Sequence, residues 1–280
     1  MKKIYCGNVH EIYEISQNEL VIVKTDRISA RGKLMPVEIA DKGIVLNKIT
    51  NFWFEKTQSI IENHVIETDV KNMPSYFHDP QFKDRTVMVK KLNILPFEVI
   101  VHGYMFGRLW KQYKKGEFND NKSRTSMYQY AEKLDEPIVT LTTKIDGIYD
   151  SDCSINLMKE KLGEDMTNRI IDVSKKLYVK CNDYAVSKGL IIADTKFEFG
   201  VDKDNNLLLA DEIFTPDSSR FWDAEKYQVG KEPYSFDKQL IRRWLDENVG
   251  ESKEKFMIPD EIKNEVRTRY FECMNRLLKE

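Results

Sequence analysis

Residues 193–214 read ADTKFEFGVDKDNNLLLADEIF, and this pattern predicts a β-hairpin that carries charged side chains on one face. Because the side chains of a strand alternate between its two faces, Asp194, Lys196 and Glu198 share one face, and the intervening threonine and phenylalanine residues share the other. The polar run DKDNN predicts a turn, and the apolar run LLLA predicts the returning strand. We expect the aromatic face to be buried and the charged face to be either solvent-exposed or a functional site.

The returning strand brings a second acidic pair, Asp211 and Glu212, close to the first strand. The pairing register decides which of the two meets the charged face, because a shift of one residue moves every side chain to the other face. In one register Asp211 lies opposite Glu198, and in the register shifted by one residue Glu212 lies opposite Lys196. The hairpin pattern alone leaves both registers open.

These residue types suit magnesium–nucleotide chemistry on an anionic substrate. Glu198 and Asp211 would offer carboxylate oxygens to Mg²⁺, an ion that binds few protein ligands together with phosphate oxygens. Lys196 could neutralise an anionic substrate or transition state, and the segment TPDSSR at 215–220 offers hydroxyl groups and an arginine for a carboxylate or phosphate. The alternative is a solvated strand with a surface ion pair, but both acidic clusters follow apolar runs, GLIIA and LLLA, that are typical of buried strands.

Length, composition and charge exclude several protein classes. The chain has 280 residues, which predicts one large domain or two packed lobes, and its 41% of hydrophobic residues is enough for a core. The net charge of −2 gives no charge-driven attraction to nucleic acid or anionic lipid. There is no run of about 18 apolar residues and no secretory signal, and the four cysteines are scattered without metal-site spacing. We therefore expect a cytoplasmic protein that binds neither nucleic acid nor membrane.

The character of the sequence changes near residue 95. Residues 1–95 are rich in short alternating stretches, such as ELVIVKTD and TVMVKKLNI, which predict antiparallel strands. Apolar residues at helical spacing predict helices near 43–62, 165–188, 235–247 and 259–279. We predict a mixed α/β (α+β) fold that has a sheet-rich nucleotide-binding lobe at 1–95, a mixed substrate and catalytic lobe at 96–280, and a ligand site in the cleft between them.

Several motifs resemble the signature segments of the SAICAR synthetase (phosphoribosylaminoimidazole-succinocarboxamide synthase) family, in order along nearly the whole chain. They are KTDRISA (24–30), KGIVLNKITNFWF (42–54), VKKLNILPFEVIVHGYMFG (89–107), EPIVTLTTK (136–144), ADTKFEFG (193–200), DEIFTPDSSRFW (211–222) and SFDKQLIRRWL (235–245). The resemblance implies a two-lobed fold whose N-terminal lobe is similar to that of protein kinases, with ATP and Mg²⁺ in the cleft. It also implies a ligase that activates a carboxylate of an aminoimidazole ribotide as an acyl phosphate, which the amine of aspartate then attacks.

The resemblance assigns roles at or near the nucleotide to four positions. Glu198 and Asp211 match ligands of Mg-ATP, which favours the register that places them opposite each other. Lys196 matches a polar catalytic residue between the nucleotide and the substrate. Lys90 or Lys91 matches a strand lysine that faces the nucleotide, and the alternative for this position is an exposed lysine on an edge strand.

The resemblance also assigns substrate-side roles. Asp194 matches a second polar catalytic residue between the nucleotide and the substrate. Arg220 matches a contact to a substrate carboxylate, and we expect its neighbours Asp217, Ser218 and Ser219 to bind substrate with it.

Lys144, in TTK, matches a substrate-side lysine. In the N-terminal loop GNVHEIY, Asn8 and His10 stand where the family has basic residues near the phosphates. After ISA the family has an aspartate, and this chain has Arg31 followed by Gly32. We therefore expect Asn8 and His10 beside ATP, and Gly32 beside a substrate with a bulkier or differently charged ring substituent.

In VHGYMFGR, His102 and Arg108 stand where an arginine and a serine of the family hold the ribotide phosphate. A histidine lacks the permanent bidentate charge of arginine and is sensitive to pH. Arg108 could hold the same phosphate from a new direction or a carboxylate of a different substrate. The alternatives are a buried neutral histidine at 102 and a solvated surface arginine at 108.

The departures fall at substrate positions, whereas the hairpin motif is retained. This pattern favours a divergent paralogue, an ATP- and Mg²⁺-dependent ligase that acts on a different small-molecule carboxylate or amine. Ordinary SAICAR synthetase is the first alternative. A nucleotide-binding inactive protein, favoured by the lost basic residues at Asn8 and His10, and a small-molecule kinase are the others. The sequence leaves an oligomer possible.

Overall fold

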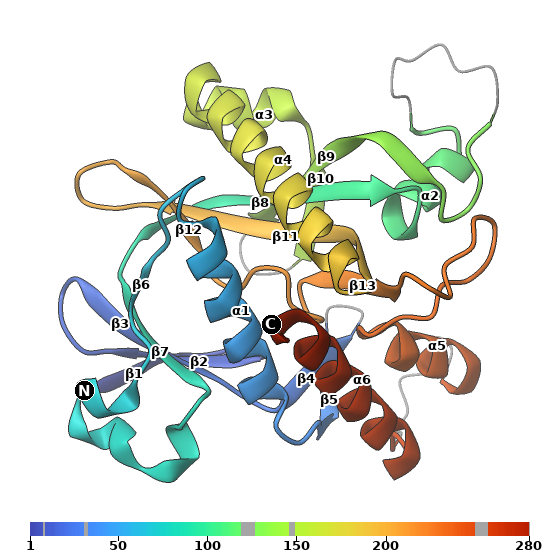
Figure 1. Cartoon of the computed structure of the whole chain (residues 1–280). Coiled ribbons are helices and arrows are strands. Elements are labelled where there is room, and N and C mark those ends of the chain that lie inside the picture. The colour runs from blue at the N-terminus through green and yellow to red at the C-terminus, as the bar shows by residue number, and fades with distance from the viewer. Residues whose placement is uncertain (8, 31–32, 119–126, 146–148, 250–256, 280) are drawn as a thin grey trace.

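The predicted hairpin is present as strands β11 (Leu190–Val201) and β12 (Leu207–Ala210) in the computed structural model (Figure 1). Its register pairs Glu198 with Ala210, so the prediction that Asp211 lies opposite Glu198 was wrong. The observed register is the alternative one, shifted by one residue. Strand β12 ends at Ala210, and the next residue, Asp211, has a positive φ of 60°. The chain therefore turns away from the sheet before either residue of the acidic pair enters the ladder.

The structure describes residues 1–7, 9–30, 33–118, 127–145, 149–249 and 257–279. Within these residues, a first sheet has the strand order β1-β2-β3-β7-β6, with every pair antiparallel. Its strands are β1 (Lys2–Cys6), β2 (His10–Glu14), β3 (Glu19–Lys24), β6 (Val65–Glu67) and β7 (Thr86–Lys90). A separate two-stranded sheet pairs β4 (Arg27–Ala30) with β5 (Lys33–Glu38).

The second sheet is built around β11. Its strand order is β10-β9-β8-β11-β12, and β13 pairs with the first half of β11 on the edge that β12 shares. Its other strands are β8 (Asn93–Tyr104), β9 (Lys133–Ile145), β10 (Tyr149–Cys153) and β13 (Ser219–Asp223). Because β11 has neighbours on both edges, side chains from three strands meet over its charged face.

The helices are α1 (Lys42–Thr57), α2 (Gly107–Lys114), α3 (Ile155–Leu162), α4 (Glu164–Ser187), α5 (Gln239–Asn248) and α6 (Asp260–Leu278). Three 3₁₀ turns lie at Val70–Asn72, Ser75–His78 and Pro80–Phe82. The four predicted helices are confirmed as α1, α4, α5 and α6, and the sequence did not predict α2 or α3. No helix in the described part of the chain combines the length and the apolarity that crossing a bilayer requires.

Helix α4 lies across one face of the second sheet, and α1 lies beside α6 (Figure 1). The buried stripe of α4 includes Ile170, Leu177 and Cys181, spaced so that they share one helical face. Tyr178 of α4 donates a hydrogen bond of 2.6 Å to the carbonyl oxygen of Ile192 in β11. This contact fixes the helix against the strand that carries the charged residues.

One hydrophobic core joins the two parts of the chain. It includes Val45 and Ile49 of α1, Phe197 of β11 and Tyr270 of α6, so it contains residues from both sides of position 95. The predicted mixed α/β class is confirmed. A division into lobes at residue 95 stays a prediction.

Backbone contacts hold β12 against the first sheet. The amide of His64 donates to Leu209 O at 3.1 Å, and the amide of Leu209 donates to Glu62 O at 2.9 Å. His64 O in turn accepts from the amide of Lys90, the last residue of β7, at 2.7 Å. The end of β12 is therefore fixed where the two sheets meet.

Candidate active site

Two carboxylates face each other across β8 and β11. Glu98 and Glu198 are register partners, and like charges in that position repel each other unless a cation lies between them. Lys196 supplies the cation, because its Nζ lies 2.5 Å from Glu98 Oε1 and 2.9 Å from Glu198 Oε1. Glu98 Oε2 also accepts a hydrogen bond of 2.8 Å from the Thr142 hydroxyl. The sequence analysis did not identify Glu98.

Lys196 is a permanent cation with one open side. Burial alone would lower its pKa, but Glu198, Glu98 and Asp211 outweigh this effect, so the pKa of Lys196 is raised and the ammonium stays charged. Its side chain is 30% exposed. A charged group that is held by carboxylates and is still accessible can contact an anionic ligand.

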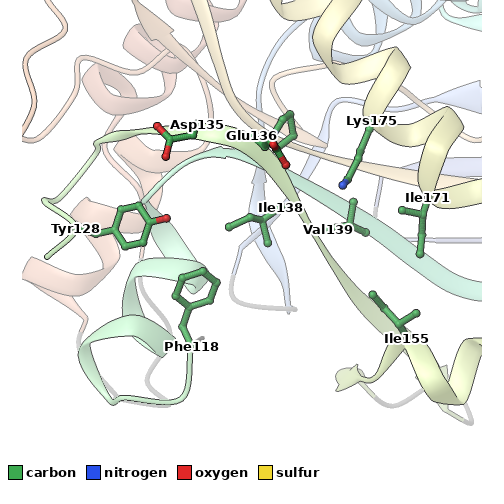
Figure 2. Close-up of a pocket in the computed structure, with 10 residues that line it drawn as sticks. Phe118, Tyr128, Asp135, Glu136, Ile138, Val139, Ile155, Ile171 and Lys175 are labelled. Carbon is green, nitrogen blue, oxygen red and sulfur yellow. The ribbon is translucent and has the colours of Figure 1, made fainter. Parts of the chain in front are cut away.

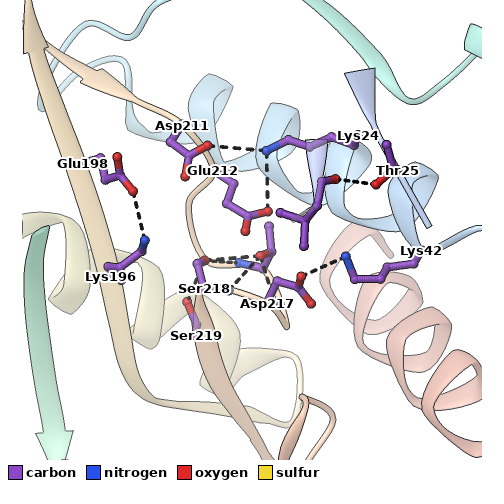
Figure 3. A network of polar contacts seen from close by, with 12 residues as sticks. Lys24, Thr25, Lys42, Lys196, Glu198, Asp211, Glu212, Asp217, Ser218 and Ser219 are labelled. Atoms are coloured by element: carbon purple, nitrogen blue, oxygen red, sulfur yellow. Dashed lines mark hydrogen bonds and ion pairs between the residues drawn. The ribbon is translucent and has the colours of Figure 1, made fainter. Parts of the chain in front are cut away.

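A second lysine, Lys24 at the end of β3, meets the acidic pair that follows β12 (Figure 3). Its Nζ lies 3.8 Å from Asp211 Oδ1 and 3.7 Å from Glu212 Oε2. Burial raises the pKa of Glu212, although Lys24 acts in the opposite direction. The two sheets thus contribute opposite charges to one cluster, which also includes the neighbouring Glu198.

The sequence placed a nucleotide-facing lysine at Lys90 or Lys91, and the structure places both at the exposed end of β7. Lys91 Nζ contacts Glu14 Oε1 at 2.5 Å on the surface, which favours the alternative of an exposed lysine. Strand β7 lies between β3 and β6 and is not an edge strand. A nucleotide role for Lys90 and Lys91 stays a prediction, whereas Lys24 points into the carboxylate cluster.

The carboxylates suit a magnesium ion. Glu198 and Asp211 offer hard oxygen atoms near the charged face of β11, and both lie within electrostatic range of Lys24 and Lys196. Among the described residues, no group of three or more His, Cys, Asp or Glu side chains is arranged to hold a metal ion. The two carboxylates Glu198 and Asp211 by themselves fit Mg²⁺, which takes one or two protein carboxylates and completes its shell with water and substrate phosphates.

At the other end of β11, Asp194 lies between His102 of β8 and Arg220 of β13, its register partners on the two sides. Arg220 and Asp194 form a close ion pair. His102 Nδ1 lies 3.8 Å from Asp194 Oδ2, and its Nε2 lies 2.9 Å from the Thr140 hydroxyl. The Arg220 guanidinium also lies over the ring of Phe106 at 5.5 Å. These contacts fix the orientation of Arg220.

Gly107 makes room for Arg220. Its φ is +57°, which disfavours residues with a side chain, and a Cβ atom here would lie 2.8 Å from Arg220 Cζ. Burial alone would lower the pKa of Arg220, but Asp194 outweighs it, so the pKa is raised. Arg220 is therefore a rigidly placed cation, as a contact to a substrate anion requires.

Arg242 of α5 adds a second guanidinium that the sequence analysis did not identify. Burial lowers the pKa of Arg242, and the nearby charge of Arg220 acts in the same direction. Burial also raises the pKa of Asp237 to about 6, although Arg242 and Arg220 oppose this. The motif SFDKQLIRRWL could have pointed to Arg242, because this arginine follows the buried Ile241 on a short amphipathic helix. Two close guanidinium groups favour binding of an anion.

His102 and Arg108 differ in their surroundings, although the charge of Arg108 still acts on His102. His102 is buried, whereas Arg108 is half-exposed and its Nη2 lies 2.5 Å from Asp152 Oδ1 of β10. Arg108 is thus engaged by a carboxylate, so a phosphate would have to compete with Asp152 for it. His10 lies on β2 as the register partner of Lys24, and its role beside ATP stays a prediction.

Three other predicted site positions are only partly described. Asn8 and Gly32 lie outside the described residues. Lys144 has a backbone position on β9, opposite Asp150, and its side chain lies outside the description. Their predicted roles at the nucleotide and the substrate stay predictions.

Asp217 has a structural environment. Its side chain is 1% exposed, and its Oδ2 lies 2.9 Å from Lys42 Nζ of α1 and 3.3 Å from Lys238 Nζ. Its Oδ1 accepts a hydrogen bond of 2.8 Å from the Tyr270 hydroxyl of α6. Burial alone would raise the pKa of Asp217, but Lys238 and Lys42 outweigh it and hold the pKa well below its usual range. These contacts give Asp217 a structural role at the junction of α1 and α6, and a direct contact of Asp217 with substrate stays a prediction.

The two serines hold the loop in place. Ser219 Oγ lies 2.7 Å from the Thr195 hydroxyl, and Ser218 Oγ accepts from the amide of Thr215 at 3.2 Å. Ser218 O also accepts from the amide of Lys196 at 3.1 Å. These contacts attach the loop to β11 and thereby place Arg220. A direct contact of either hydroxyl with substrate stays a prediction.

A pocket of about 250 Å³ lies apart from these clusters, between β9, α3 and α4 (Figure 2). Ile138 and Val139 of β9, Ile155 of α3, and Ile171 and Lys175 of α4 contribute to its lining. None of the described residues that line it belongs to the charged face of β11. The two charged clusters, and not this largely apolar pocket, hold the groups suited to phosphate chemistry.

The buried state of His102 predicts sensitivity to acid. Burial lowers its pKa to about 4, although Asp194 acts in the opposite direction, so His102 is neutral at pH 7. In the unfolded chain the histidine binds a proton below about pH 6.5, whereas in the folded protein it does so only below about pH 4. The contribution of neutral His102 to the free energy of unfolding is therefore complete above pH 6.5 and is lost as the pH falls to about 4. We expect a loss of about 3 kcal/mol from His102 over this range, as an order of magnitude.

Urea unfolding at pH 7.5 and at pH 5 checks this expectation. His102→Gln should lose less free energy of unfolding between the two pH values than the unchanged protein does. His64, whose pKa burial also lowers to about 4, is present in both proteins and contributes equally. Equal losses in the two proteins would contradict a neutral buried His102.

The chain is similar to proteins of one enzyme family over its whole length. A family model described as SAICAR synthetase matches residues 3–258. Phosphoribosylaminoimidazole-succinocarboxamide synthase of Maridesulfovibrio salexigens is 41% identical over 282 residues, which cover 99% of this chain and 94% of the relative. The Saccharomyces cerevisiae protein of the same name is 39% identical over 97% of this chain and 92% of its own length. The solved SAICAR-synthase from Saccharomyces cerevisiae complexed with SAICAR has a TM-score of 0.89 and 37% identity, covering 100% of this chain and 95% of that chain.

Proposed function

Because the chain belongs to the SAICAR synthetase family, and is therefore an ATP-dependent ligase that forms a C–N bond and releases ADP, we propose that it catalyses the ordinary reaction of that family. In this reaction the carboxylate of carboxyaminoimidazole ribotide is joined to the amine of aspartate. The names of relatives that are 39–41% identical over nearly the whole chain support this choice of substrates. The single observation that carries the proposal is Lys196, held between Glu98 and Glu198 and partly open to a ligand.

In the proposed mechanism, Glu198 and Asp211 would hold Mg²⁺, and the ion would screen the phosphate charges of ATP. Lys196 contributes a permanent positive charge beside these carboxylates. It neutralises the charge on the phosphoryl group as this group moves from ATP to the substrate carboxylate. Glu98 keeps the lysine in place through its ion pair, and the Thr142 hydroxyl in turn fixes Glu98 by donating a hydrogen bond to it.

The transfer gives ADP and an acyl phosphate of the substrate. The amine nitrogen of aspartate then attacks the activated carbonyl carbon, the C–N bond forms, phosphate leaves, and the nitrogen loses a proton. No enzyme nucleophile is required, because an acyl phosphate reacts with an amine directly. The thiols agree with this mechanism, since burial raises the pKa of Cys153, Cys181 and Cys273 and keeps them protonated.

The Arg220 end of β11 would bind the anionic groups of the substrates. Arg220 is oriented by Asp194 and Phe106, and Arg242 adds positive charge nearby. A phosphate or carboxylate bound here would relieve the repulsion between the two guanidinium groups. Arg220 is the register partner of Asp194, and Asp194 and Lys196 are two residues apart on the same face of β11. A substrate whose anionic group binds Arg220 would therefore have its second carboxylate near Lys196.

An altered substrate is the second candidate, and one observation favours it. His102 is neutral and Arg108 is paired with Asp152, at the two positions that the family uses for the ribotide phosphate. A ligand with a weaker or differently placed anionic group would fit these residues better. The expected substrates in this case are a related carboxylate and amine.

A steady-state assay with carboxyaminoimidazole ribotide, aspartate and ATP distinguishes the candidates. We expect ADP and phosphate as products, and we expect their release to depend on added aspartate. The kcat/KM should be roughly 10⁴ M⁻¹s⁻¹ or above. A much lower value, with higher activity on a related pair, would establish the second candidate. Release of ADP without any amine would indicate a small-molecule kinase, and pyrophosphate as a product would contradict the acyl-phosphate mechanism.

A further inference from the structure

Lys24 is a buried ammonium whose contacts in the protein are incomplete. Its side chain is 3% exposed, and among the described residues its Nζ has no hydrogen-bond partner. Asp211 Oδ1 at 3.8 Å and Glu212 Oε2 at 3.7 Å lie beyond the roughly 2.7–3.2 Å of an N–H···O hydrogen bond. Figure 3 shows the ammonium between these two carboxylates, at the junction of the two sheets.

A buried charge is costly unless it is both paired and hydrogen-bonded. Lys24 nevertheless stays charged, because Glu212, Asp211, Asp217 and Glu198 raise its pKa against the effect of burial. Lys42 is a useful comparison, since it is equally buried and its Nζ also lacks a well-aligned hydrogen bond within the described part of the chain, but it lies only 2.9 Å from Asp217 Oδ2. Lys42 therefore has the close partner of a structural ion pair, and Lys24 retains donors for a further acceptor.

The position of Lys24 limits what that acceptor can be. Asp211, the proposed metal ligand, lies 3.8 Å from Lys24 Nζ, so a phosphate oxygen on the metal would be within reach of the ammonium. The adjacent β1–β2 turn reads GNVHE and supplies no lysine or arginine. Lys24, whose register partner on β2 is His10, is the lysine that the first sheet directs at this cluster.

We propose that Lys24 is a phosphate ligand of the nucleotide, in which its ammonium donates hydrogen bonds to an ATP phosphate oxygen while Asp211 and Glu212 hold it in place. This inference rests on the proposed function, because it takes the nucleotide of that reaction as the ligand. An ammonium suits the role, since it acts as a compact point charge towards phosphate. Lys24 would thus contribute to ATP binding from the first sheet, as Lys196 contributes to the chemistry from the second.

Isothermal titration with adenosine, AMP, ADP and ATP in the presence of Mg²⁺, without a second substrate, tests the inference. For Lys24→Met we expect adenosine to bind within about twofold of the unchanged protein. ATP should bind roughly 10- to 100-fold more weakly, as expected for loss of a charged hydrogen bond. The nucleotide at which the loss first appears identifies the phosphate that Lys24 contacts.

Two matched variants control for charge and burial. Lys48→Met removes a half-exposed lysine of α1 that pairs with Asp84, and it should leave all four affinities unchanged. Lys42→Met removes a buried lysine with a structural partner, and it should lower stability without a selective loss for ATP. If Lys24→Met does not fold, the affinities for ATP and adenosine are measured on Lys24→Gln instead.

The inference is overturned if ATP binds the Lys24 variants normally, or if adenosine and ATP weaken equally. It is also overturned if the unchanged protein binds no nucleotide. A protein that binds ATP but shows no amine-dependent turnover would contradict the proposed reaction alone, because the nucleotide series would still report on Lys24.

Discussion

Glu198→Gln should lower ATP turnover by roughly 100-fold or more at low Mg²⁺ while the protein stays folded. Glutamine keeps the shape of the side chain but loses the negative charge that attracts a hard cation. A bound metal ion contributes several kcal/mol of charge stabilisation, and each 1.36 kcal/mol is a tenfold change in rate. Glu198 is mostly buried beside Lys196, so solvent cannot easily replace the missing carboxylate.

The dependence on Mg²⁺ separates a metal ligand from a residue that only orients Lys196. ADP release is measured over a series of Mg²⁺ concentrations for the unchanged protein, Glu198→Gln and Asp211→Asn. Both variants should need more Mg²⁺ for half-maximal turnover. Glu265→Gln is a suitable control, because Glu265 pairs with Arg269 on the half-exposed surface of α6. Unchanged turnover with the usual Mg²⁺ dependence would contradict the metal assignment.

The sequence was sufficient to predict the hairpin but not its register. Alternating charged and aromatic residues, a polar turn and a following apolar run predict two antiparallel strands without information from the rest of the chain. The end of β12 depends on contacts made elsewhere, because the backbone of Leu209 is hydrogen-bonded to Glu62 and His64, which immediately precede β6 of the first sheet. Asp211 then leaves the strand with φ at 60°, a conformation that the acidic motif does not signal.

The inward-facing lysine shows a similar limit. VIVK and VMVK are near-identical strand endings on β3 and β7, and local pattern could not distinguish Lys24 from Lys90. Their difference comes from the second sheet, since the acidic residues after β12 pack against β3. The exposed Lys91 pairs instead with Glu14 on the outer side of the first sheet.

Long-range partners also explain why the sequence analysis missed Glu98 and did not predict the buried surroundings of Asp217. Glu98 contacts Lys196 from 98 positions away, and only the register of β8 with β11 brings them together. Asp217 lies in a polar loop that is typical of a ligand site. Its partners Lys42 and Tyr270 come from opposite ends of the chain, and they enclose it in the interior. Such contacts depend on packing and not on any local motif.

Lys196→Met should slow the chemical step by roughly 10²–10³-fold, the usual effect of removing one group that stabilises charge in a transition state. Single-turnover release of ADP measures this step directly. The substitution also removes the ammonium that lies between Glu98 and Glu198. We therefore expect lower stability as well, by less than the roughly 3–5 kcal/mol of a fully buried pair, because Lys196 is 30% exposed.

A double variant separates the two effects. Adding Glu98→Gln to Lys196→Met removes the repulsion between the two carboxylates, and the new amide side chain can keep a hydrogen bond to Thr142. The thermal unfolding midpoint should recover towards that of the unchanged protein, whereas the rate should stay low, since no cation has returned to the charged face of β11. If the rate recovers together with stability, Lys196 acts only by holding the carboxylates apart. The charge that stabilises phosphoryl transfer must then come from another residue, and Lys24 on the first sheet is a candidate because it lies beside Asp211 and Glu212.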